Sequence, residues 1–112
     1  MQDQETFEQF WREYLEAHKH PATRGIHIAG TAAALLGIAL SIVTFDPTFL
    51  VGGIILAYAA AWLSHAFVER NAPKTFSHPA WSLRADLRML ALATRGQLQA
   101  EMERHAIQSA RD

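Results

Sequence analysis

Two long apolar stretches dominate the pattern of hydrophobic and polar positions along the chain. Residues 26–45 and 48–68 contain no Asp, Glu, Lys or Arg, and only Asp46 and Pro47 separate them. With 20 and 21 residues, each stretch is long enough for a helix to cross roughly 30 Å of hydrocarbon. We therefore predict two transmembrane helices joined as a hairpin, the alternative being a soluble bundle that buries both helices fully.

An amphipathic helix is predicted on the N-terminal side of the hairpin, over residues 3–19. Its apolar side chains recur at helical spacing and form one stripe, which comprises Phe7, Phe10, Trp11, Tyr14 and Leu15. Such an aromatic helix is typical of the membrane interface, and packing against the hairpin is its plainer role. Pro21 is expected to end this helix, because proline lacks a backbone donor.

A second amphipathic helix is predicted after the hairpin, over residues 82–98, with Ser82 as its N-cap. Its stripe comprises Leu83, Leu87, Leu90, Ala91, Thr94 and Leu98. Gly96 weakens this helix without necessarily ending it. The polar residues 99–112 are expected to form a solvated or fraying helix end. The predicted fold is therefore all-α, an integral membrane helical hairpin flanked by amphipathic interfacial helices.

The chain has the length of a single domain, residues 1–112. Small residues recur at three- and four-residue spacings in both apolar stretches, at Gly30, Ala33, Ala34 and Gly37 and at Gly53, Ala57, Ala60, Ala61 and Ser64. Such residues let helices approach closely in lipid. Their partner is either the other arm of the hairpin or another copy of the chain, so the pattern leaves a homo-oligomer open.

The net charge and the absence of cysteine limit the classes of partner and of chemistry that the chain can have. The net charge is −1, from ten basic and eleven acidic residues, and no Lys/Arg block is present, so we expect no nucleic acid partner. The sequence has no cysteine, which excludes disulfides, thiolate nucleophiles and cysteine-bound zinc or iron–sulfur centres. A metal ion would therefore need His, Asp or Glu ligands.

Basic residues near the open end of the hairpin predict its orientation. Arg12, Lys19 and Arg24 precede the first stretch, Arg70, Lys74, Arg84 and Arg88 follow the second, and the tip holds only Asp46. Positive charge is concentrated on the cytoplasmic side of membrane proteins, so both termini should be cytoplasmic. The expected location is the cytoplasmic membrane of a bacterium, or the endoplasmic reticulum if the source is a eukaryote.

Two histidines lie at matched depth in the apolar stretches. His27 precedes Asp46 by 19 positions and His65 follows Pro47 by 18, so each lies roughly 27 to 29 Å from the tip of the hairpin. An antiparallel hairpin would bring them level. Imidazoles are costly to bury without a partner, and a shared metal ion is one such partner. The alternative is a pair of polar residues that hydrogen-bond a carbonyl or a lipid headgroup.

Further histidines lie just outside the apolar stretches. His18, at the end of the first helix, and His78, in the loop after the hairpin, could complete a four-nitrogen set. His20 is two residues from His18, so both cannot point the same way in a helix, and we favour His18 as the ligand. His105 lies in the polar tail and is expected at the surface.

A carboxylate accompanies the second of the matched histidines. Glu69 lies one helical turn after His65, where it could be a ligand or the acceptor that orients a ligand histidine. An ion pair with Arg24 or Arg70 is the alternative role for Glu69. Imidazole and carboxylate ligands suit Zn, Fe, Cu or Ni, and the pattern does not choose among these metals.

One combination of residues has a spacing that is specific when taken together. It comprises Phe10, Trp11, Tyr14, Leu15, His18, His20, Pro21, Arg24, His27, Gly30, Tyr58, Trp62, His65, Glu69, Asn71, Ala72, Pro73, Phe76, His78, Pro79, Ala80, Trp81, Ser82 and Asp86. Over about residues 7–89, the chain resembles the Mpo1-like family of small membrane proteins, also called the DUF962 family. That family includes a fungal enzyme of the endoplasmic reticulum.

The resemblance implies an Fe(II)-dependent dioxygenase of fatty acid α-oxidation. It would act on 2-hydroxy fatty acids, including those formed in phytosphingosine breakdown, and shorten them by one carbon. Carried over by motif, the iron ligands would be His18, His27, His65 and His78, with Glu69 close by. The implied partners are a lipid-like substrate, molecular oxygen and the lipid bilayer.

The substrate carboxylate would need a basic partner, and Arg24 or Lys74 is the candidate. Two other classes of function compete with the dioxygenase. One is a non-catalytic membrane scaffold or lipid-binding protein, whose histidines hydrogen-bond headgroups. The other is a zinc-dependent membrane hydrolase, which would hold zinc and consume no oxygen.

Overall fold

A computed structural model of the chain describes residues 6–72, 78–105 and 107, and every regular element among them is a helix. The elements are α1 (Phe7–Ala17), α2 (Pro21–Thr44), α3 (Thr48–Ser64), the π-helical turn η1 (His65–Glu69), α4 (Pro79–Thr94) and α5 (Leu98–Arg104). This confirms the all-α fold class. The candidate residue Lys74 lies outside the described residues.

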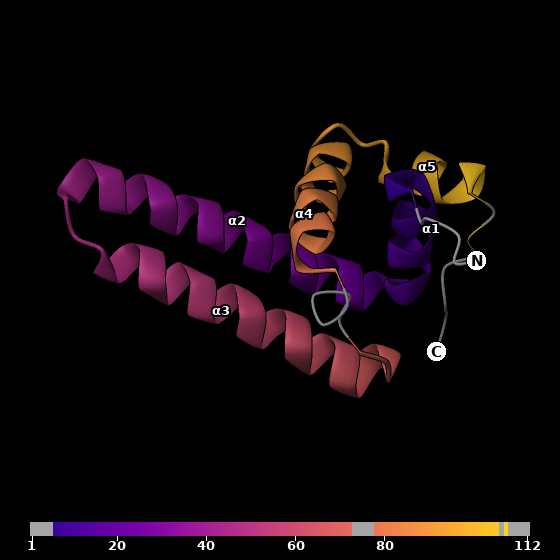
Figure 1. Cartoon of the computed structure of the whole chain (residues 1–112), viewed down its shortest axis with the longest axis horizontal. Helices are drawn as coiled ribbons and strands as arrows, with labels where there is room; N and C mark the ends of the chain where they lie inside the picture. Colours follow the sequence, from indigo (N-terminus) through magenta and orange to yellow (C-terminus); the bar gives the residue numbers. More distant parts are fainter. Residues whose placement is uncertain (1–5, 73–77, 106, 108–112) are drawn as a thin grey trace.

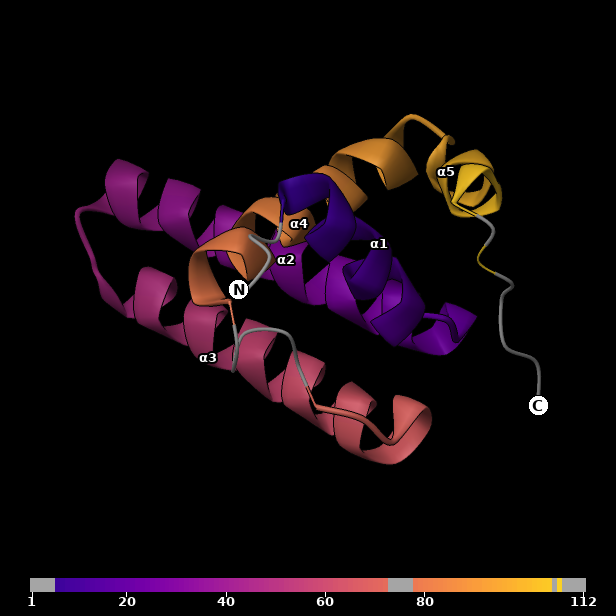
Figure 2. The ribbon, with the colours of Figure 1, turned by 45° about the vertical axis from the view of Figure 1, so that its right-hand side comes forward.

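Helices α2 and α3 lie side by side as a long hairpin, whose tip projects away from the other helices (Figures 1 and 2). Phe45 adopts a left-handed backbone, with φ 56°, where α2 ends, and the Asp46 carboxylate accepts a hydrogen bond from the Thr48 amide. Glycines let the two backbones touch. A Cβ added to Gly53 would lie 2.9 Å from the Ala33 carbonyl oxygen, and one added to Gly37 would clash with the Phe49 carbonyl oxygen. These small residues therefore pack within the hairpin.

The two arms of the hairpin are long and apolar enough to cross a membrane. Only 17% of the most apolar window of each arm is buried within the chain, so neither arm is the buried core of a soluble bundle formed by this chain alone. Large apolar side chains such as Ile42, Val43, Ile55 and Phe67 are mostly exposed. That exposure is what lipid-facing helices require, because lipid tails are as apolar as the side chains.

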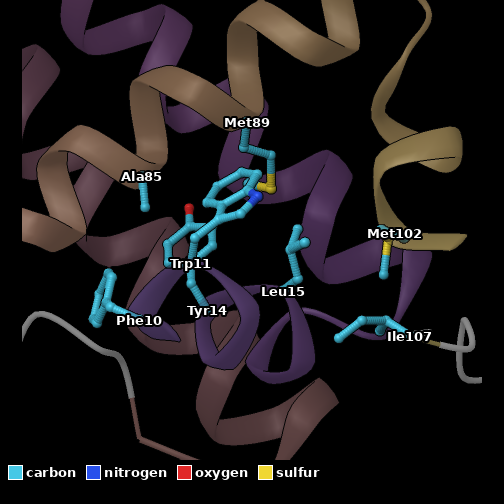
Figure 3. Close-up of a cluster of buried hydrophobic side chains, with 8 residues drawn as sticks. All are labelled: Phe10, Trp11, Tyr14, Leu15, Ala85, Met89, Met102 and Ile107. Carbon is cyan, nitrogen blue, oxygen red and sulfur yellow. The ribbon is translucent and has the colours of Figure 1, made fainter. Parts of the chain in front are cut away.

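The remaining helices form a cap at the open end of the hairpin, which comprises α1, α4 and α5 (Figure 1). Thr6 and Gln9 start α1 with a capping box, in which each side chain bonds to the other residue's backbone amide. The apolar stripe of α1 is buried against the other cap helices. Figure 3 shows this cap core, which contains Phe10, Trp11, Tyr14 and Leu15 of α1, Ala85 and Met89 of α4, Met102 of α5, and Ile107.

The second amphipathic helix differs from its predicted bounds. Helix α4 begins at Pro79, three residues before Ser82, because proline suits the first turn, where no amide donor is needed. It ends at Thr94, and Gly96 with φ 69° turns the chain into α5, so this glycine does end the helix. At the start of the hairpin, α2 begins at Pro21, five residues before the apolar stretch.

The expectation of a solvated tail over residues 99–112 is wrong for part of that range. Glu101, Met102 and Ile107 are buried. The Trp11 indole N–H donates to the Glu101 carboxylate at 2.7 Å, and Met102 packs into the cap core. The polar composition of this segment led to a wrong prediction, because one of its carboxylates, that of Glu101, is buried with several hydrogen-bond donors around it.

Candidate metal centre

Three histidines from three elements meet where the cap joins the hairpin. His18 follows the last residue of α1, His27 lies in the second turn of α2, and His65 begins η1. One ligand nitrogen of each lies within 4.8 Å of those of the other two. The residues are 1%, 8% and 1% exposed, respectively. A π-helical turn at a functional site is a common arrangement, and here it carries one member of the cluster.

Hydrogen bonds assign the tautomers of His18 and His65. The Nδ1 atom of His18 lies 2.7 Å from the Tyr14 carbonyl oxygen, which can only accept, so Nδ1 carries the proton. The Nδ1 atom of His65 lies 2.7 Å from Asn71 Oδ1. The Asn71 amide nitrogen donates to the Ala17 carbonyl oxygen at 3.2 Å, which orients its oxygen toward His65. The Nε2 atoms of both histidines are therefore unprotonated when the rings are neutral.

The two unprotonated nitrogens face each other. Nε2 of His18 and Nε2 of His65 are 3.1 Å apart, a distance at which a hydrogen bond would need a proton on one of them. Both Nδ1 atoms already hold the proton of a neutral ring. Two lone pairs at this distance repel, and a cation between or beside them would turn the repulsion into binding. This arrangement fits a metal ion.

In His27 the two ring nitrogens exchange roles: Nε2 is hydrogen-bonded, and Nδ1 is the nitrogen left for a metal. Its Nε2 lies 2.6 Å from Asp86 Oδ1, so Nε2–H donates to the carboxylate. The Tyr14 hydroxyl donates to the same oxygen at 2.5 Å. His27 Nδ1 is buried and has no hydrogen-bond partner among the described residues. An unsatisfied buried nitrogen is costly, and a metal ion is the partner that would satisfy it.

Burial controls the charge of the residues on the α1 side of the cluster. The pKa of His18 lies well below its usual value because the ring is desolvated and because His27 and His65 lie close. Burial, reinforced by the charge of Asp86, raises the pKa of the Tyr14 hydroxyl, so Tyr14 remains a donor. A neutral imidazole is the form that binds metal.

The fourth predicted histidine ligand lies outside this cluster. The His78 ring stacks on Trp81, with centroids 5.3 Å apart, and also contacts Phe10. His20 is the N-cap of α2, where its Nδ1 accepts from the Ala22 amide, so His18 rather than His20 joins the cluster. A ligand role for His78 stays a prediction.

The predicted catalytic residues Glu69 and Arg24 contact backbone atoms near the cluster. Glu69 accepts a hydrogen bond from the His20 amide at 2.6 Å, which ties η1 to the start of α2. Arg24 donates to the carbonyl oxygens of His18 and Lys19 at 2.9 and 2.7 Å. These contacts hold the turn that carries His18. The catalytic roles of Glu69 and Arg24 stay predictions.

We expected His105 at the surface, but the structure places it largely buried. Its side chain is 18% exposed, and Nε2 lies 3.3 Å from the Glu101 carboxylate. It belongs to the polar group that surrounds Glu101 in the cap.

Three residues that orient the histidines were not predicted as part of the metal centre. These are Tyr14, Asn71 and Asp86. Asp86 carried a usable signal, because it lies between Leu83 and Leu87 on the apolar side of its helix. A carboxylate in such a place needs a donor from another element. Asn71 and Tyr14 gave no comparable signal, since their contacts depend on the tertiary fold.

An apolar groove of about 320 Å³ begins beside the cluster. It runs between α2, α3 and α4, and His27 and Asp86 line one end. Most of the other lining side chains are aliphatic. Concave apolar sites with a few convergent polar groups are typical of small-molecule binding.

A family model described as "2-hydroxy-palmitic acid dioxygenase Mpo1-like" matches residues 4–98 of the chain. The matched range contains the three clustered histidines and the residues that orient them. No curated protein matches the chain, and no solved structure does.

Proposed function

Because the chain belongs to the Mpo1-like family, we propose that it is an Fe(II)-dependent membrane dioxygenase that shortens 2-hydroxy fatty acids by one carbon. The observation that carries the proposal is the cluster of three buried imidazoles, each with one nitrogen occupied by a hydrogen bond and the other left for a metal. The family description supplies the class of reaction.

The donor set suits iron with room for substrate. Three imidazole ligands leave coordination positions open, as non-haem iron oxygenases require. His18, His27 and His65 would hold the metal, and the tautomer of each is set by an acceptor outside the cluster. Bound Fe(II) would supply the activation of molecular oxygen, which no amino-acid side chain provides.

The overall reaction balances without an external reductant. A 2-hydroxy acid and one molecule of O₂ give the acid one carbon shorter, CO₂ and water. The bond between the carboxyl carbon and the hydroxyl-bearing carbon breaks, and O₂ accepts all the electrons released. The residues of the chain orient the ligands, hold Tyr14 and Asp86 in their hydrogen bonds and keep bulk water from the buried cluster.

The membrane would deliver the substrate to this centre. In the proposed arrangement the two arms of the hairpin span the bilayer, and both termini and the cap lie on the cytoplasmic side. A lipid whose head is polar can then reach the histidines while its tail stays in apolar surroundings. The location would be the bacterial cytoplasmic membrane, or the endoplasmic reticulum of a eukaryote.

Metal analysis tests the proposal. The full chain is purified in detergent under nitrogen without a histidine-rich tag, beside His27→Ala and His65→Ala. We expect about one iron per chain, lost in both variants, and oxygen-dependent conversion of 2-hydroxypalmitic acid to the acid one carbon shorter by the parent chain. Unchanged iron content in either variant would contradict the ligand assignment.

The competing functions predict different results in the same preparation. Stoichiometric zinc without oxygen consumption would favour a hydrolase, because three histidines also bind catalytic zinc. A folded chain that takes up no added Fe(II) would favour the scaffold. Within the described part of the chain, Nδ1 of His27 has no hydrogen-bond partner, and a scaffold gives no reason to leave a buried nitrogen unpaired.

A further inference from the structure

We infer that the apolar groove binds the acyl tail of the substrate and that Ile38 and Ile54 limit the chain length it accepts. This inference rests on the proposed function and adds the place and the size selectivity of tail binding. Ile38 is the lining residue of α2 nearest the tip of the hairpin, and Ile54 is that of α3.

The groove has a polar end and an apolar end. His27, Thr31 and Asp86 line it beside the histidine cluster. The Thr31 hydroxyl donates to the His27 carbonyl oxygen at 3.0 Å, and Asp86 Oδ1 already accepts from Tyr14 and His27. The polar groups are thus largely engaged within the protein. Toward the tip, the lining passes to Leu35, Ile38 and Ile54, which offer a tail only apolar contact.

The length of the groove matches an acyl tail. Ile38 lies 11 positions after His27 along α2, which corresponds to about 16 Å of helix. One leaflet of a bilayer contributes half of the hydrocarbon core, about 15 Å, and this thickness is filled by lipid tails. A single tail of membrane-lipid length would therefore reach from the cluster to the isoleucines.

The groove is open to the surroundings of the hairpin, so a tail can enter sideways. Its lining residues Ile38 and Ile54 are 42% and 41% exposed, and Leu83 on the α4 side is 61% exposed. No charged side chain other than Asp86 lines the groove among the described residues. A lipid could thus slide in from the bilayer without passing through water.

Chain-length selectivity tests the inference, and neighbouring isoleucines give a matched control. Ile54→Trp should fill the far end of the groove, whereas Ile55→Trp adds the same bulk at a residue that is 63% exposed and outside the lining. For 2-hydroxy acids of palmitic length or longer, we expect kcat/KM to fall about tenfold in Ile54→Trp, which corresponds to the loss of roughly two buried methylenes. For short 2-hydroxy acids, kcat/KM should fall less than for the long ones, and iron content equal to that of the parent chain shows that the variant folds.

Variants that enlarge the groove test the same inference in the opposite direction. Ile38→Ala and Ile54→Ala should shift the preference toward longer acids, while Ile55→Ala should not. If Ile54→Trp and Ile55→Trp showed the same chain-length profile as the parent chain, the groove would not hold the tail.

A photo-crosslinking experiment separates this inference from the proposed function. The full chain, supplied with Fe(II) under nitrogen, is illuminated with a 2-hydroxy fatty acid that carries a diazirine at its terminal carbon. Labels on lining residues such as Leu35, Ile38 and Ile54 support the groove, and labels only on positions outside the lining, such as Ile42 and Ile55, overturn it. Absence of turnover by the parent chain with every acid would contradict the dioxygenase, and the position of the label would still decide where the tail binds.

Discussion

The hairpin and the cap of this protein are stabilised in opposite ways. In the outer hairpin, backbone meets backbone at Gly37 and Gly53, and most large apolar side chains point outward. In the cap, the aromatic side chains of Phe10, Trp11 and Tyr14 are completely buried. Polar groups there pair across long sequence separations, as Trp11 does with Glu101. The difference follows from the surroundings each part is suited to, because lipid offers apolar side chains no penalty whereas water drives them together.

The candidate metal centre lies where these two regions meet. Its histidines come from the end of α1 and from both arms of the hairpin, and the carboxylate that orients His27 comes from α4. Cap and hairpin must therefore dock correctly before the three rings can share a ligand. Variants that damage one region alone can show how far each supports the site.

The largest effect should come from the cap core. Trp11→Ala removes a fully buried indole and leaves Glu101 without one of its donors, so we expect a loss of about 3 to 5 kcal/mol in cap stability. Phe45→Ala, at a side chain that is 92% exposed at the tip of the hairpin, should be nearly neutral. Near-UV circular dichroism during detergent-to-SDS titration measures the difference. Equal midpoints for the two variants would show that cap burial does not dominate stability.

The stability of the hairpin should be most sensitive to substitutions where its two backbones touch. Gly53→Val places a branched side chain where a Cβ alone would lie 2.9 Å from the Ala33 carbonyl oxygen, and we expect a cost of about 1 to 3 kcal/mol. Gly52→Val is the matched control, since a Cβ at Gly52 meets nothing within 4 Å. The SDS midpoint of helix loss compares the two. If Gly52→Val were as destabilised as Gly53→Val, helix propensity rather than packing would explain the effect.

At the junction, Asp86→Asn should weaken metal binding without unfolding either region. The substitution keeps the shape of the side chain but removes the charge that orients and polarises His27. Loss of such an outer acceptor typically costs about 10- to 100-fold in metal affinity. Competition with a chelator for Fe(II) measures the change, and Glu103→Gln at an exposed position serves as the charge-matched control. Unaltered affinity in Asp86→Asn would show that this carboxylate does not act on the metal site.

The smallest effect concerns the response of the cap to acid. Burial alone would raise the pKa of Glu101, but hydrogen bonds from Arg104 and Trp11 outweigh it, and the pKa lies below its usual value of 4.5. A lowered pKa in the folded state means that the stabilisation is present above about pH 4.5 and is lost as the pH falls through the lowered value. We expect about 1 kcal/mol or less, because Arg104 is largely exposed.

Stability measurements between pH 6 and pH 3 check this prediction. These pH values bracket the usual pKa of a glutamate side chain, which is roughly 4. Glu101→Gln should flatten the acid-dependent loss in the cap. Glu103→Gln, at an exposed carboxylate on the same helix, should leave it as in the parent chain. An unchanged pH dependence in Glu101→Gln would assign the acid response to other carboxylates.

The sequence by itself determined the hairpin, the first cap helix and the class of protein. The two apolar arms, the turn at Asp46 and Pro47, and the aromatic stripe of α1 follow from composition and helical period, which are local properties. The equal distances of His27 and His65 from the tip of the hairpin also predicted that these two histidines lie level, and the structure brings the third predicted histidine, His18, beside them. The family follows from the spacing of the same residues.

Only the tertiary structure decided which groups touch. His18 and His65 are separated by 47 positions, His27 and Asp86 by 59, and Trp11 and Glu101 by 90. No local period relates residues so far apart, so the pairing of Asp86 with His27 and that of Glu69 with the His20 amide could not be predicted, although the position of Asp86 on the apolar side of its helix indicated that it needs a donor. The buried tail was missed for the same reason, because a polar segment is buried only when another element supplies its partners.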